Sequence, residues 1–222
     1  MDRRNFLSAV AASASVTATG CIGDNGNTAL SPPENYEMLS EADLPRPLYG
    51  ERIPEATVEA PLRGTDPSTR GFVGERHVLM TFIYTRCTEV CLSLTSNLVQ
   101  AQVDATEEGY SDEIVFLPTT FDPAHDTADV LRRYGEERGA DLDAENWYFL
   151  RPDGEKRARE VVEDTFGVGY ERNPPDAAME FTHTSMILLA NRDGYVERAY
   201  TGTPPNPAEL VDDVRTVVDG FS

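Results

Sequence analysis

The sequence predicts an α/β domain in which a mixed parallel and antiparallel sheet is flanked by helices and ends in a β-hairpin and a last helix. Two observations lead to this prediction. Buried apolar runs of strand length alternate with segments of helical periodicity, and a strand–turn–strand pattern closes the series. With 222 residues, 40% of them hydrophobic, the chain can form one domain with its own core, plus appendages.

The first half of the domain contains the two most apolar strand candidates. A short strand is expected at residues 57–60, and the run at residues 77–84 is typical of a buried strand. Apolar residues at helical spacing then predict a helix over residues 87–108. Residues 113–120 form the next buried strand, and polar capping side chains open a helix over residues 126–138.

The second half alternates in the same way. We expect a short strand at residues 147–150 and a helix at residues 155–165. Residues 185–200 contain two apolar runs around the turn sequence NRDG, which is typical of a hairpin. The last helix is expected at residues 207–219, with a proline at its start and a glycine after its end.

The chain is strongly acidic, with 39 Asp and Glu against 19 Lys and Arg and a formal net charge of -20. Such a surface repels nucleic acid and anionic lipid headgroups, so a nucleic-acid partner is not expected. Lys156 is the only lysine, and the acid is spread along the chain. This composition favours adaptation of a halophilic protein to high salt, and an acidic docking face is the alternative.

The N-terminal residues are read as an address that is not part of the fold. Paired arginines followed by a small, weakly apolar run make residues 1–20 resemble a twin-arginine signal for an exported lipoprotein. The segment before Cys21 resembles a lipobox, so we expect a lipid anchor there, on the outer face of the cytoplasmic membrane; the alternative is a stray signal-peptide cysteine. Residues 21–54 are then expected to be a flexible tether.

Cys87 and Cys91 lie at the junction between a predicted buried strand and a predicted helix. Four residues apart on a helix, they would share one face with Cα atoms about 6 Å apart. This separation is compatible with a disulfide and with one thiophilic ion held by both sulfurs. Spacing alone does not distinguish these functions from a stapling disulfide or from two buried thiols.

Three separated segments carry a resemblance to a known family. Residues 82–91 read FIYTRCTEVC, residues 120–127 read TFDPAHDT, and His183 opens an apolar run. In this order, over about residues 55–220, they resemble the SCO/SenC family of copper-binding, thioredoxin-like proteins that assemble cytochrome c oxidase. Leu92 departs from the family pattern, which often has proline after the second cysteine, but this departure removes no ligand.

The resemblance implies a thioredoxin-like domain over residues 55–222 and a copper site made by Cys87, Cys91 and His183. The residue types agree with it, because soft thiolates hold Cu(I) and imidazole binds either copper state. The resemblance also implies that Asp122 is a partner of this site. As a residue before a proline, Asp122 is equally compatible with a turn carboxylate.

The implied function is that of a copper-binding metallochaperone that helps assemble the dinuclear copper centre of a terminal haem-copper oxidase. Its partners would be the copper-centre subunit of that oxidase and a copper donor or thiol reductant. The alternative is a membrane-tethered thiol–disulfide oxidoreductase, whose redox pair Cys87 and Cys91 keeps partner cysteines reduced. A copper store or sensor is a third hypothesis. Only the copper-binding functions require His183.

The other histidines and the methionines are not expected to bind metal. His77 begins a buried strand and is interpreted as an edge residue, whereas His125 lies in a turn beside carboxylates. Met80, Met179 and Met186 are interpreted as core or surface residues, because none of them matches a ligand position of the family.

Overall fold

Residues 27–42, 44–88 and 90–221 are described by a computed structural model. The predicted signal at residues 1–20 and the predicted lipid anchor Cys21 lie outside these residues. Within the described part of the chain, no helix combines the length and the apolar character that a membrane crossing requires.

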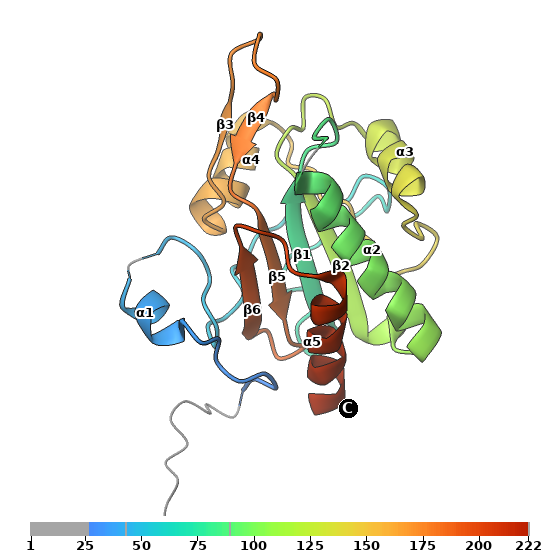
Figure 1. The fold of residues 1–222 in the computed structure, drawn as a ribbon. Helices are drawn as coiled ribbons and strands as arrows, with labels where there is room; N and C mark the ends of the chain where they lie inside the picture. The colour runs from blue at the N-terminus through green and yellow to red at the C-terminus, as the bar shows by residue number, and fades with distance from the viewer. Residues whose placement is uncertain (1–26, 43, 89, 222) are drawn as a thin grey trace, which may run out of the picture.

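The central sheet has four strands in the order β2-β1-β5-β6 (Figure 1). Strand β1 (His77–Ile83) pairs in parallel with β2 (Ile114–Thr120) and antiparallel with β5 (Met186–Ala190). Strand β5 in turn pairs antiparallel with β6 (Val196–Thr201). The mixed sheet and its terminal hairpin are therefore confirmed, and every residue of β1, β2 and β5 is buried, as continuous apolar runs predict.

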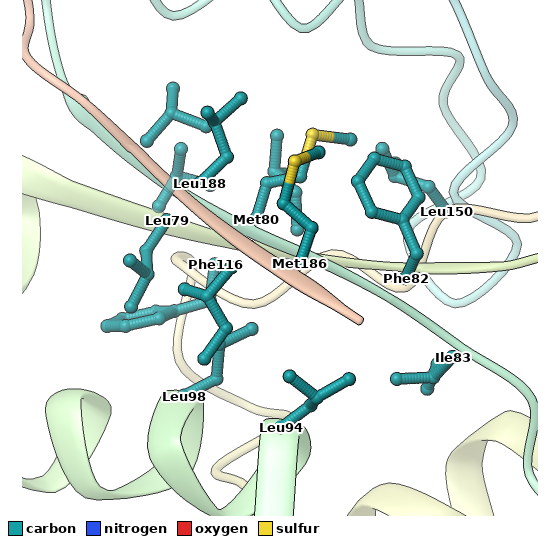
Figure 2. Close-up of a cluster of buried hydrophobic side chains, with 14 of the residues drawn as sticks. Leu79, Met80, Phe82, Ile83, Leu94, Leu98, Phe116, Leu150, Met186 and Leu188 are labelled. Atoms are coloured by element: carbon teal, nitrogen blue, oxygen red, sulfur yellow. The ribbon is translucent and has the colours of Figure 1, made fainter. Parts of the chain in front are cut away.

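Side chains of β1 alternate between two apolar layers (Figure 2). On one side, Leu79 and Ile83 point toward Leu94 and Leu98 of the helix that follows β1. On the other side, Phe82 packs against Phe166, with ring centroids 5.2 Å apart. The core therefore fills both faces of the sheet.

Helix α2 (Val90–Glu108) begins three residues later than the sequence predicted. The chain first has to turn out of β1, and the N–H of Cys87 donates to the Tyr84 carbonyl in that turn. Cys87 therefore lies in the loop, and only Cys91 belongs to the helix. The expectation that both thiols share one helical face is wrong.

Two later helices are confirmed, with caps that explain where they begin. Helix α3 (Ala128–Arg138) is capped by Thr127, whose side chain accepts from the Val130 N–H. Helix α5 (Pro207–Gly220) is capped by Asn206, whose side chain accepts from the Ala208 N–H, and it packs beside α2. A 3₁₀ turn, η1 (Ser111–Glu113), leads into β2.

The remaining predicted elements are partly regular. The helix expected at residues 155–165 is observed as α4 (Glu155–Ala158), which continues as the π-helix η2 (Arg159–Thr165). Residues 57–60 and 147–150 form isolated bridges instead of full strands. A short helix, α1 (Tyr36–Glu41), was not predicted.

A second, two-stranded sheet was also not predicted. Strand β3 (Tyr170–Arg172) pairs antiparallel with β4 (Phe181–His183), separately from the central sheet. Figure 1 shows this hairpin projecting beyond the end of β1 from which the chain enters α2. The hairpin matters because His183 is its last paired residue.

The N-terminal segment packs on the domain, so the expectation of a flexible tether over residues 21–54 does not hold for its described part. Leu30 and Ile53 are buried in the core. The carboxylate of Glu197, which is fully buried on β6, accepts from the backbone N–H groups of Ala29 and Leu30. A buried carboxylate requires such donors, and the segment supplies them.

Candidate metal centre

Three side chains with metal-binding atoms lie close together at the loop between β1 and α2. Cys87 comes from the loop, Cys91 from the first turn of α2, and His183 from the end of β4. One ligand atom from each residue lies within 4.8 Å of the others. The Cys91 Sγ and His183 Nε2 atoms are 3.5 Å apart. The fold therefore brings together the three residues that the sequence resemblance singled out.

The loop that carries Cys87 is fixed by a buried carboxylate. Asp126 accepts from the Thr85 hydroxyl at 2.5 Å and from the Thr85 N–H at 3.2 Å. The Thr120 hydroxyl, at the end of β2, donates to the same carboxylate at 2.5 Å. Burial raises the pKa of Asp126, and the three donors oppose that rise. Asp126 thus ties the cysteine loop to the neighbouring strand.

The imidazole of His183 is held by aromatic rings and by one hydrogen bond. Its ring lies 5.0 Å from Phe121 and 5.9 Å, edge to face, from Tyr84. The His183 Nδ1 atom is 3.2 Å from the Thr184 carbonyl oxygen. Because a carbonyl oxygen only accepts, Nδ1 is the donor in this bond, which leaves Nε2, on the Cys91 side, as the ring atom that can bind a metal. This is the arrangement that metal-binding histidines use.

Both thiols are buried, Cys91 completely and Cys87 with 4% of its surface exposed. The hydrogen bond with the Cys87 thiol, followed by burial, raises the pKa of Cys91 well above its usual range. Burial and the neighbouring Cys87 also raise the pKa of Tyr84 to about 12. The Cys91 thiol is therefore protonated near neutral pH, and a bound cation would displace its proton.

Asp122 lies next to the cysteine loop and is almost fully buried, with 1% of its surface exposed. One of its carboxylate oxygens is 2.6 Å from Arg86, the neighbour of Cys87, and the other is 3.2 Å from Arg172 on β3. Asp122 is thus bonded to two arginines, which join it to both structural units that supply the ligands.

His77 lies in the core, which corrects its interpretation as an edge residue. It is fully buried at the start of β1, and its Nδ1 accepts from the Arg192 N–H at 3.1 Å. Burial first, and then the charge of Arg192, lowers the pKa of His77 to about 4. His125 is half-buried in its turn. Met80 and Met186 are core residues, and Met179 is exposed.

Sequence reasoning missed the aromatic packing around the imidazole. Phe121 stacks on Tyr170 with ring centroids 4.8 Å apart, and Tyr84 meets Phe181 edge to face at 5.1 Å. These rings come from four segments, so no local pattern announces them. One signal was available: Phe181 and His183 are two residues apart on a strand and therefore face the same side.

Comparison with known proteins identifies relatives of this architecture. The family model described as SCO1/SenC matches residues 63–219. A curated relative, the SCO1 protein homolog of Bacillus subtilis (strain 168), is 24% identical over 139 residues, which cover 62% of this chain and 69% of the relative.

Solved structures share the fold. A SCO1/SenC family lipoprotein from Bacillus anthracis str. Ames matches with a TM-score of 0.63 and 20% identity, over 79% of this chain and 99% of that one. BsSco, described as having a disulfide switch, matches with a TM-score of 0.60 and 20% identity, over 76% and 94%. Copper-bound ScoI of Bradyrhizobium japonicum matches with a TM-score of 0.57 and 18% identity, over 76% of this chain and 99% of that one. With a family match that spans most of the folded domain and a thioredoxin-like α/β architecture, the chain belongs to the SCO1/SenC family.

Proposed function

We propose that this protein is a copper chaperone that binds the ion through Cys87, Cys91 and His183. It would deliver the ion to the copper-centre subunit of a terminal haem-copper oxidase and so help assemble the dinuclear centre. The observation that carries the proposal is the convergence of two thiols and one imidazole within 4.8 Å. Membership of a family whose solved relatives include copper-bound structures supports the choice of metal.

The chemistry of the three ligands suits copper as a cargo. Thiolate sulfur is a soft ligand that favours Cu(I), and imidazole accommodates both copper states. A structural zinc site normally closes four ligands around the ion, whereas these three residues leave the shell incomplete. Such a shell can hold an ion and still admit a ligand from an acceptor protein, which transfer requires.

The two thiols and the imidazole come from different structural units. Cys87 and Cys91 belong to the loop and helix that follow β1, whereas His183 belongs to the separate hairpin of β3 and β4. The imidazole can therefore leave with the hairpin while the thiols keep their places. This division offers a route by which the ion passes to an acceptor without unfolding of the domain.

We propose that the chain is exported and lipid-anchored on the outer face of the cytoplasmic membrane. The twin-arginine-type signal at residues 1–20 and the cysteine at position 21 support this, and one structural relative is itself described as a lipoprotein. The net charge of -20 supports a halophilic setting, in which concentrated salt screens the acidic surface. A copper donor or a thiol reductant would serve it there.

A second candidate function is thiol–disulfide exchange, because the Cys91 thiol is hydrogen-bonded to the Cys87 thiol. In that reaction the two thiols would close into one disulfide while a partner disulfide becomes two thiols, so two electrons and two protons pass to the partner. Burial of both sulfurs limits the access of a partner disulfide. The convergence of His183 on the two thiols favours the chaperone, because thiol–disulfide exchange does not require an imidazole there.

An anaerobic copper titration of the reduced full chain in high salt tests the proposal. A Cys21→Ser background leaves only the two site thiols, and His183→Ala is compared with His125→Ala, a control in a half-buried turn. We expect one ion per chain, with an affinity lowered at least about tenfold by His183→Ala and unchanged by the control. Undiminished binding by His183→Ala would refute the site. Absence of copper binding with a readily cycling disulfide would favour the oxidoreductase.

A further inference from the structure

Four charged side chains form a closed ring beside the candidate metal centre. We call Arg86, Asp122, Arg172 and Glu180 the ion cluster. Arg86 Nη2 lies 2.6 Å from Asp122 and 2.5 Å from Glu180. Arg172 lies 3.2 Å from Asp122 and also pairs with Glu180. Each member thus contacts both members of opposite charge, and the ring is neutral overall.

The ion cluster connects the two structural units that supply the ligands. Arg86 directly precedes Cys87 in the loop, and Asp122 follows the end of β2. Arg172 is the last residue of β3. Glu180 directly precedes β4 and stands three residues before His183. Two members therefore belong to the thiol side of the site and two to the imidazole side.

The hairpin requires an attachment of this kind. Its sheet consists of three residue pairs and is separate from the central sheet. A hairpin of that size is at best marginally stable by itself. Aromatic packing supplies part of the attachment, and Arg172 adds to it by covering the Phe181 ring at 4.4 Å. The ion cluster supplies the charged part.

The members differ in exposure, and this difference assigns their roles. Asp122 is buried, so its carboxylate depends on the two arginines to compensate for lost hydration. The side chains of Arg86, Arg172 and Glu180 are 42%, 44% and 24% exposed. Asp122 is thus the fixed end. Arg172 ties the hairpin to it directly, and Glu180 ties the hairpin to Arg86 of the cysteine loop.

We infer that the ion cluster is a clasp that holds the β3–β4 hairpin over the cysteine loop. Arg86, Arg172 and Glu180 are positioning residues, which set how tightly His183 closes over the two thiols. With the clasp open, the thiols become accessible, and a bound ion loses its imidazole. The effect on copper rests on the proposed function, whereas the effect on thiol access does not.

The test uses Glu180→Gln, which removes a charge from the clasp and leaves every proposed ligand in place. Glu171→Gln is the matched control, because Glu171 is an exposed residue of the same hairpin outside the ion cluster. Both are made in the full chain with Cys21→Ser. The first readout, without metal, is the rate at which iodoacetamide alkylates Cys87 and Cys91. The second is the rate at which a Cu(I) chelator removes the ion.

We expect Glu180→Gln to accelerate both rates about fivefold and Glu171→Gln to leave both unchanged. Arg172→Gln approaches the same clasp from its positive side. If the clasp is real, the double variant with Glu180→Gln accelerates alkylation by less than the product of the single effects. Circular dichroism verifies that each variant is folded.

An alkylation rate of Glu180→Gln that matches the parent's would overturn the clasp. Equal acceleration by Glu180→Gln and Glu171→Gln would overturn it too, because any loss of charge would then suffice. If the parent chain binds no copper, the proposed function fails. The alkylation rates then still decide whether the clasp exists.

Discussion

His77 lowers the stability of this protein as the pH falls from 6.5 to 4, and one substitution at this position removes its contribution to the pH dependence. The imidazole is fully buried, and its pKa is lowered from 6.5 to about 4 by burial and by Arg192. Between these two pH values, His77 is protonated in the unfolded chain and neutral in the folded chain. Stability is therefore complete above pH 6.5 and declines as the pH falls toward 4.

The size of the effect follows from the two pKa values of His77. A shift from 6.5 to about 4 corresponds to about 3 kcal/mol once the pH is below both values, at about 1.4 kcal/mol per tenfold change in proton affinity. At pH 5, where the unfolded chain is almost fully protonated and the folded chain is not, the loss is about 2 kcal/mol.

The assay is denaturant unfolding at pH 7 and pH 5, in constant high salt, for the parent chain and for His77→Asn. An asparagine oxygen can accept the Arg192 N–H in place of Nδ1, and the amide does not titrate. We expect the parent to lose about 2 kcal/mol more than the variant between the two pH values. Carboxylates titrate in both chains, so they cancel in the comparison. Parallel losses would refute the reasoning.

Three further predictions address the cysteine loop, the N-terminal segment and the surface charge. Asp126→Ala leaves the Thr85 and Thr120 hydroxyls without their acceptor, and we expect the free energy of unfolding to fall by about 1–3 kcal/mol; a change below about 0.5 kcal/mol would contradict this account. Glu197→Ala removes the acceptor that holds residues 29–30, so chymotrypsin should cut after Tyr36 faster than in the parent, and an unchanged rate would argue against the attachment. Lowering salt from about 1 M to about 0.1 M lengthens the screening distance from about 3 Å to about 10 Å, and the thermal midpoint should fall; a rise would count against the halophilic interpretation.

The parts of the fold that the sequence predicts are those with a local physical cause. Strands β1 and β2 can be predicted because burial on both faces requires an unbroken apolar run. Helix α3 can be predicted because Thr127 supplies an N-cap ahead of a helical pattern. The three site residues were found through the order of three motifs, since a lone histidine such as His183 carries little information by itself.

The parts that the sequence does not predict depend on contacts between distant segments. Apolar periodicity begins at Leu92, so it does not show that Cys87 belongs to a turn and not to the helix. The hairpin of β3 and β4 is too short and too polar to give a strand signal. The docking of Ala29 on Glu197 joins residues 168 positions apart, and its segment has the composition of a linker. The ion cluster has the same origin, because its members come from separate segments.

The docked N-terminal segment also determines how the domain would stand on a bilayer. Ala29 lies against Gly220, near the end of α5, and His77 at the start of β1 packs against neighbouring Phe221. The thiols follow the opposite end of β1, whose seven residues span about 23 Å. With Cys21 lipidated as proposed, the six residues from there to residue 27 reach at most about 20 Å. The length of these six residues would thus limit the distance of the domain from the lipid surface. The metal centre would face away from the membrane, where the extramembrane part of an acceptor can meet it.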